Sequence, residues 1–395
     1  MYRENKIMLI GNTEECYCGS SKTFKSCCKG KAISSKAQPL GEDILSNPNR
    51  INHMLQQMLK ATDFKICMHP DKEKCKMPIK NAHSLQNNGV LSLIAEKDHV
   101  MANDLLNKVR DGYSTKRVSK NDATTFYGFC EYHDSVVFQE IELKPYENNV
   151  KQNCLFAYRA CAQEYHKKQR EIKAIQNCFK DNPSLFLEDE FVMSYKLRKL
   201  ALDDVNQTMD IFNNGINNDN YDIMENYVYE FDNQYDFAVT TTFCPAEDLI
   251  GKQLNDIYST NPERLKAVFI TVIPVVGKTY FIISCLKEDY SNLKSYFEQI
   301  ENLNEDELKV FLNNVIPEYS ENIVLSPRLW GEWTNFSKKE YEKMVTGEIG
   351  DFGEMLKGGL PYDSFDDFMR GMDIRNGKIN VMQKPKYDLF KLKNI

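Results

Sequence analysis

The sequence has no long uninterrupted hydrophobic segment. Hydrophobic residues make up 42% of the 395-residue chain, enough for a folded core. However, the longest apolar run, 267–276, contains a threonine and a proline and falls well short of the ~18 residues that span a bilayer. The N-terminus leads into only four apolar residues, 7–10, too few for the core of a secretory signal. We therefore expect a soluble cytoplasmic protein that does not engage a membrane.

Several enzyme signatures are also missing. The chain has no phosphate-binding glycine loop followed by Lys and Ser or Thr, no nucleophile turn of the Gly-x-Ser-x-Gly type and no dinucleotide fingerprint. Residues 221–395 carry no other motif with a known mechanism, so the sequence leaves the role of this half unassigned.

Acidic charge is unevenly distributed. Residues 1–200 contain 31 Lys and Arg against 24 Asp and Glu, a net charge of +7, whereas residues 201–395 contain 19 against 33, a net charge of −14. A basic region attracts phosphate backbones and an acidic one repels them. Any DNA or RNA partner should therefore bind the N-terminal half, although charge also varies between domains for no functional reason.

Cysteine is abundant, with twelve residues. In a reducing compartment, closely spaced cysteines bind metal more often than they form disulfides. Four of them fall within residues 16–30, as a Cys-x-Cys pair and a Cys-Cys pair separated by eight residues, and such a set can enclose one tetrahedral zinc ion. The four candidate ligands are Cys16, Cys18, Cys27 and Cys28.

This segment resembles the SEC-C motif, a small zinc module found in the SecA translocation motor and in other bacterial proteins. The similarity includes Gly19, Ser20, Phe24 and the basic residues between the pairs, while Tyr17 replaces the usual proline. The resemblance implies a docking module for a protein or ribosomal partner and no catalysis. A purely structural anchor for the N-terminus is the alternative.

A second set of metal ligands is spread over residues 67–134. Cys67 and Cys75 are separated by seven residues, and Cys130 and His133 by two. A closed structural zinc site often takes its four ligands from two pairs that lie far apart in the sequence, and so connects separate segments. These four residues therefore predict a Cys3His zinc site. His69 could replace one of the cysteines, and His99 is a possible extra ligand.

The order of this second set resembles the treble-clef unit of HNH-type nucleases. In that family a cysteine pair, a catalytic histidine and a second ligand pair follow one another, which places His83 at the general base. Asp134 is the nearest carboxylate for a catalytic divalent ion such as Mg2+ or Mn2+. The alternatives are that His83 binds a backbone carbonyl and that Asp134 caps a helix at 135–141.

Hydrophobic patterning predicts an α+β protein. We expect a zinc module at 1–31, a linker at 32–50, a zinc-stabilised treble-clef-like domain at 51–150, a helical region at 151–220 and an α+β domain at 221–395. Helices are predicted over 49–61, 153–180, 188–213, 290–300, 304–314 and 338–346. Strands are predicted at 236–243, 267–275 and 279–286, the last two forming a hairpin in an antiparallel sheet covered on both faces. Residues 104–122 are expected to form a basic loop.

Two functions fit these features. The first is a metal-dependent nuclease, docked through its SEC-C module, in a phage-defence setting suggested by its resemblance to such proteins. The second is a non-catalytic adaptor in which both zinc sites are structural. The two differ in what they predict for His83.

Overall fold

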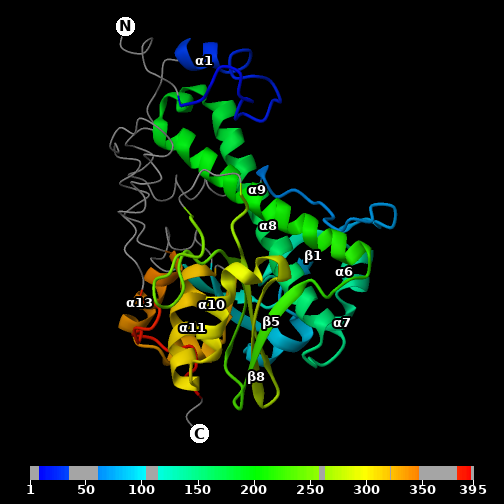
Figure 1. Cartoon of the computed structure of the whole chain (residues 1–395), viewed down its shortest axis with the longest axis vertical. Helices are drawn as coiled ribbons and strands as arrows, with labels where there is room; N and C mark the ends of the chain where they lie inside the picture. Colours follow the sequence, from blue (N-terminus) through cyan, green and yellow to red (C-terminus); the bar gives the residue numbers. More distant parts are fainter. Residues whose placement is uncertain are drawn as a thin grey trace.

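The computed structural model describes residues 9–34, 61–103, 114–257, 263–320, 322–346 and 380–392. Most of the expected linker and of the helix predicted over 49–61 lies outside these ranges, as do Lys108 and Arg110 of the predicted basic loop. The described residues form a mixed α+β structure, as the sequence predicted, with an antiparallel sheet at its centre (Figure 1).

The central sheet has seven strands in the order β3-β2-β9-β6-β7-β8-β5, and every neighbouring pair is antiparallel. Its members are β2 (His99–Asn103), β3 (Thr115–Ser119), β5 (Met224–Phe231), β6 (Phe237–Phe243), β7 (Val268–Val275), β8 (Lys278–Leu286) and β9 (Ile323–Leu325). The strands of the sheet therefore come from both sides of the boundary expected near residue 220.

The β7–β8 hairpin is built from β-branched and aromatic residues, which favour extended backbone. Val275 pairs with Lys278, and the turn between them places Gly277 at a φ of +81°, a conformation that glycine adopts without strain. Both strands are buried along nearly their whole length, because helices cover the sheet on both faces.

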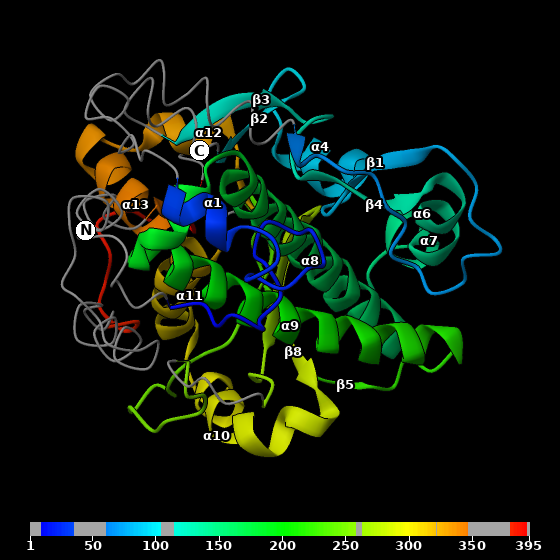
Figure 2. The ribbon, with the colours of Figure 1, turned by 90° about the horizontal axis from the view of Figure 1, so that it is seen from above.

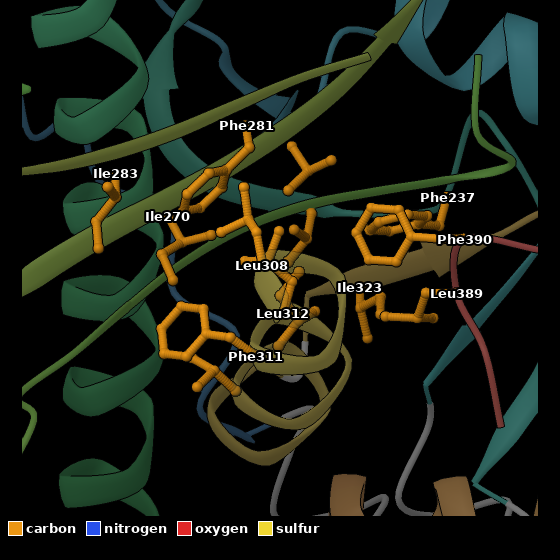
Figure 3. Close-up of a cluster of buried hydrophobic side chains, with 14 of the residues drawn as sticks. Phe237, Ile270, Phe281, Ile283, Leu308, Phe311, Leu312, Ile323, Leu389 and Phe390 are labelled. Carbon is orange, nitrogen blue, oxygen red and sulfur yellow. The ribbon is translucent and has the colours of Figure 1, made fainter. Parts of the chain in front are cut away.

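One face of the sheet packs against C-terminal helices. These are α10 (Tyr290–Glu301), α11 (Glu305–Tyr319), α12 (Pro327–Glu332) and α13 (Asn335–Thr346). Phe311 and Leu312 of α11 meet Ile270 and Phe281 of the sheet, and Phe390 from the C-terminal segment completes this core (Figure 3). Helix α11 begins with a capping box in which Asn304 and Glu307 bond each other's backbone amides.

The opposite face is covered by a long helical hairpin. Helix α8 (Val150–Asp181) and helix α9 (Asp189–Asn217) are joined by the short 3-10 helix η2 (Pro183–Leu187) and lie side by side (Figures 1 and 2). One end of α8 crosses the sheet, contacting β6 and β7. The other end reaches beyond the sheet and holds helix α1 (Lys29–Ser34) and its cysteine-rich loop.

A smaller unit contains β1 (Ile79–His83), β4 (Thr125–Cys130), α6 (Glu131–Val137) and α7 (Gln139–Glu142). Strands β1 and β4 pair antiparallel as a two-stranded sheet, and α6 follows β4 directly. Phe126 and Phe129 of β4 pack against α8. This unit therefore lies beside the main sheet rather than in it.

The residues between β1 and β4 run from this unit into the large sheet. They form the π-helix η1 (Asn87–Leu91), the short helix α4 (Ser92–Ile94) and strands β2 and β3. Buried Glu342 of α13 holds the start of β3, because its carboxylate accepts hydrogen bonds from the amides of Ser114 and Thr115 at 2.7 and 2.9 Å. The segment is thereby fixed to the C-terminal helices.

Most predicted elements are confirmed, and two are wrong. Asp134 does not cap a helix at 135–141, because α6 already begins at Glu131 and its N-cap residue is Cys130. The predicted loop at 104–122 contains β3, which is an edge strand with one polar face. A half-exposed edge strand lacks the continuous apolar run by which the inner strands were recognised.

Candidate metal centres

The first cysteine cluster lies in the loop before α1. The sulfur atoms of Cys16, Cys18, Cys27 and Cys28 all lie within 4.8 Å of one another. Cys27 Sγ is 3.6 Å from Cys18 Sγ and 3.7 Å from Cys28 Sγ. In a tetrahedron with Zn–S bonds of ~2.3 Å, neighbouring sulfurs are about 3.8 Å apart. The cluster therefore fits one zinc ion.

The N-terminal module is anchored by aromatic rings. Tyr17 stacks on Tyr195 of α9 with ring centroids 4.2 Å apart, and Phe24 lies 4.7 Å from Phe186 of η2. Tyr17 and Phe24 are both buried. Aromatic pairs of this kind stabilise a contact beyond the apolar area that they bury. They fix the module to the tip of the α8–α9 hairpin, which lies far from the module in the sequence.

The second cluster joins three separate parts of the chain. Cys67 and Cys75 come from the loop before β1, Cys130 ends β4, and His133 lies in the first turn of α6. All four ligand atoms lie within 4.8 Å of one another. His69 and His99 are not members of this cluster.

Distances in the second cluster also match a tetrahedral site. His133 Nδ1 lies 3.4 Å from Cys67 Sγ, 3.6 Å from Cys75 Sγ and 3.3 Å from Cys130 Sγ. For Zn–N bonds of ~2.0 Å and Zn–S bonds of ~2.3 Å, the corresponding edge of a tetrahedron is about 3.5 Å. This donor set also fits zinc.

Neighbouring groups support the ligands of this cluster. The backbone amide of Lys76 lies 3.4 Å from Cys130 Sγ, as expected of a donor that stabilises a metal-bound thiolate. The ring of His69 stacks on that of His133 at 3.9 Å and 13°. His69 therefore positions the His133 imidazole and does not replace a cysteine ligand.

Burial governs the protonation of the cluster thiols. It raises the pKa of Cys16 to about 11 and that of Cys67 to about 12. Burial also acts to raise the pKa of Cys18, but hydrogen bonds from Ser20 and the neighbouring thiols lower it to about 7. A metal ion binds the thiolate form of cysteine. It must therefore displace the protons of the thiols whose pKa is raised, so metal binding is coupled to proton release.

The predicted pair of His83 and Asp134 lies in the β1–β4 unit. His83 ends β1, opposite Thr125, and Asp134 follows His133 in α6. His83 Nε2 is 3.2 Å from the carbonyl oxygen of Lys120. Because a carbonyl only accepts hydrogen bonds, Nε2 carries the proton and Nδ1 the lone pair. Burial lowers the pKa of His83, so its imidazole is neutral at neutral pH.

Two further charges lie near this pair and were not predicted from the sequence. Arg159 of α8 is buried and forms an ion pair with Glu142 of α7. Both contribute to the electrostatic environment of His83 and of Asp134, and His83 also acts on Asp134. Asp134 Oδ1 and Arg159 Nε are buried without a hydrogen-bond partner among the described residues. Arg159 lies within the helix predicted over 153–180, and no pattern in that segment marks its side chain as buried.

Other predicted features of the sequence have plain structural roles. Cys154 and Cys161 are buried in the core between α8 and the sheet, whereas Cys178 is half-buried against the core under the N-terminal module. His99 is exposed at the start of β2, and its Nδ1 bonds the carbonyl of Lys97. Within the described parts of the chain, no helix combines the length and apolarity needed to cross a membrane.

The described residues thus define an α+β protein with two cysteine-rich clusters that could bind zinc. No protein-family model, curated protein or solved structure matches the chain.

Proposed function

We propose that this chain is a two-zinc protein whose second cluster supports a metal-dependent nuclease centre of the HNH type. The observation that carries the proposal is the order of elements around that cluster. A cysteine pair is followed by β1, which ends at His83, and then by β4 and α6, which supply Cys130 and His133. This order is similar to the treble-clef arrangement that such nucleases use.

His83 is the general base of the proposed centre. Its Nε2 proton is held by the Lys120 carbonyl, which orients the ring and leaves the lone pair on Nδ1 to accept a proton from water. The lowered pKa keeps the base unprotonated at neutral pH. The cleavage rate should therefore stay constant as pH falls from 8 and decline only below about 6.5, the ordinary histidine pKa.

Asp134 is the carboxylate of the proposed centre. It lies one residue after the zinc ligand His133, so the folded zinc cluster fixes its backbone. Its Oδ1 atom has no hydrogen-bond partner among the described residues. A hard cation such as Mg2+ or Mn2+ prefers oxygen ligands and would stabilise charge on a scissile phosphate. Arg159 supplies a second positive charge nearby.

The test uses His83→Ala with His99→Ala as a matched control, because His99 is exposed and bonds a neighbouring carbonyl. Cleavage of labelled DNA and RNA is measured with Mg2+ or Mn2+. His83→Ala should reduce the rate by about 100-fold or more, as expected for a lost general base, while zinc content and melting temperature stay near those of the wild type. Unchanged cleavage in His83→Ala would remove the histidine from the mechanism.

The second candidate function is a non-catalytic adaptor. It is favoured by the position of the N-terminal module, which resembles SEC-C and stands at the far tip of the α8–α9 hairpin. Lys22, Lys25 and Lys31 of this module are exposed, so the module presents a basic surface to a protein or ribosomal partner. Absence of cleavage by the wild-type protein, together with partner capture that is lost when residues 1–31 are deleted, would favour the adaptor.

A further inference from the structure

A cavity of about 630 Å³ lies between α8 and one end of the central sheet. It is distinct from both cysteine clusters, none of whose ligands line it. Its size falls in the range of small-molecule sites, ~300–1,000 Å³. Most of the side chains that line it are polar, which is unusual for a gap left by imperfect core packing.

The cavity exists because β9 is short. Strand β9 pairs with β6 only from Phe237 to Val239, and with β2 only at Met101 and Ala102. Strand β6 continues to Phe243, beyond the end of β9. A slot therefore opens beside Thr240, Thr241 and Thr242, which all line the cavity.

Helix α8 forms the charged wall. Gln163, Glu164, Lys167 and Arg170 line the cavity, and their spacing of three and four residues places them on one helix face. Glu164 lies 3.8 Å from the ammonium group of Lys167 and 3.4 Å from that of Lys168. Lys168 does not line the cavity, so the cations of this wall are Lys167 and Arg170, and Glu164 is its carboxylate.

The opposite wall is formed by hydroxyl and amide groups. Thr240 is 2% exposed, and its Oγ1 has no hydrogen-bond partner among the described residues. The same holds for the buried Oγ1 of Thr124. A buried polar group without a partner is costly, so these two hydroxyls call for a polar ligand or bound water. The amide nitrogen of Asn322 is already used, because it donates to the Ser84 hydroxyl at 2.8 Å and to the backbone carbonyl of Thr240 at 3.1 Å.

An aromatic ring completes the lining. Tyr319 is 42% exposed, and its ring is stacked on that of Phe243 at 4.2 Å and 4°. The stack holds the tyrosine rigidly beside the hydroxyl wall. An exposed, fixed aromatic ring is a platform on which a nucleobase can stack.

We propose that this cavity binds a phosphorylated small molecule of mononucleotide size. Lys167 and Arg170 contact its phosphate, the threonine hydroxyls bond its sugar, and Tyr319 stacks on its base. Each part of the ligand is complementary to one part of the lining. The cationic side chains bind the phosphate oxygens, the threonine hydroxyls bond the sugar hydroxyls, and the exposed tyrosine ring stacks on the flat base. The proposal is independent of the nuclease centre.

Isothermal titration of the full-length, zinc-loaded protein tests the proposal, with AMP, adenosine and ribose 5-phosphate as probes and no added divalent ion. AMP should bind with a stoichiometry near one, and about tenfold or more tighter than either fragment. Arg170→Gln should reduce AMP affinity to that of adenosine, and Tyr319→Leu should reduce it to that of ribose 5-phosphate. The measurements are repeated in His83→Ala, where AMP binding should persist even though cleavage is lost.

Two control variants lie outside the cavity lining. Arg198→Gln is matched to Arg170→Gln, because Arg198 also lies on the hairpin and pairs with Glu171 at 3.8 Å. Phe336→Leu is matched to Tyr319→Leu, because Phe336 is 59% exposed. Both should bind AMP as the wild type does. The proposal is overturned if AMP shows no saturable binding at millimolar concentration, or if neither cavity variant weakens it while both remain folded.

Discussion

The two cysteine clusters have nearly the same ligand atoms, but they differ in how many parts of the fold they connect. The ligands of the first, Cys16 to Cys28, lie within a single loop. Those of the second, Cys67 to His133, join a loop, a strand and a helix. A metal in the first cluster would organise one short segment, whereas a metal in the second would close a long segment that also supplies two strands of the main sheet.

This difference predicts how much of the structure is destabilised when each cluster loses its metal. The N-terminal module contacts the remainder of the protein through aromatic rings at the tip of the α8–α9 hairpin. The β1–β4 unit instead packs through Phe126 and Phe129 into the core formed with α8. Removing zinc should therefore act locally in the first case and on the main body in the second.

The largest effect is expected for Cys130→Ser. Zinc-coupled folding is worth on the order of 10 kcal/mol or more, and loss of this unit would expose part of the α8 core. We expect zinc to fall from two ions per chain to one and the main melting temperature to fall by more than about 10 °C. Metal analysis and calorimetry check this. Cys178→Ser is the control, because Cys178 belongs to neither cluster; if it destabilises the protein as much, the comparison fails.

A smaller, local effect is expected for Cys28→Ser. Zinc should again fall from two ions to one, but the main unfolding transition should move by less than about 3 °C. Faster hydrogen exchange should be confined to residues 9–34 and to the hairpin tip around Phe186, because those are the surfaces the module contacts. Faster exchange in β6 or β7 would show that the first cluster also supports the main body.

Undocking the module without removing its metal sharpens the comparison further. Tyr17→Ala removes the ring that stacks on Tyr195, and truncation of a buried aromatic costs about 3 kcal/mol. Both zinc ions should remain, while protection of the hairpin tip against hydrogen exchange decreases. Loss of zinc from Tyr17→Ala would show that docking and metal binding are one event.

The first cluster could be predicted from the sequence because its ligands are neighbours, and ligand type plus spacing was sufficient. The second was predicted from the type and order of its ligands, which form two pairs far apart in the sequence. Its geometry depends on the pairing of β1 with β4 across an insertion, and no local pattern shows that His83 lies opposite Thr125. Asp134 was misplaced as a cap because the helix begins earlier, after extended Cys130, whose side chain makes no cap bond.

The cavity beside β6 could not be predicted at all. In the sequence, the threonines of β6 indicate only a strand, because threonine has a high strand propensity. Their role as lining depends on the three-residue length of β9 and on which face of α8 meets them. These are facts of tertiary packing, since Thr240 and Lys167 lie far apart in the sequence. The broad α+β class was nonetheless accessible, because the long helices and the β7–β8 hairpin carry strong periodic patterns.

The smallest expected effect concerns the two buried thiols of α8 that belong to neither cluster. Burial raises the pKa of Cys154 to about 12 and raises that of Cys161. A thiol whose folded pKa exceeds its unfolded value contributes stability that is complete below the unfolded pKa and is lost as pH rises toward the folded one. Above pH ~9, each should lower the free energy of unfolding by up to about 1.4 kcal/mol per pH unit. Cys154→Ala should make this slope shallower; an unchanged slope would contradict the assignment.

Two closed zinc sites of different composition are the central claim, and X-ray absorption of the purified protein with metal analysis tests it most directly. Seven cysteines and one histidine over two sites predict two zinc ions per chain, with an average shell of 3.5 sulfurs and 0.5 nitrogens calculated from those eight ligands. Cys130→Ser should shift the remaining signal to four sulfurs. About one zinc per chain in the wild type, or a shell rich in oxygen, would contradict the account.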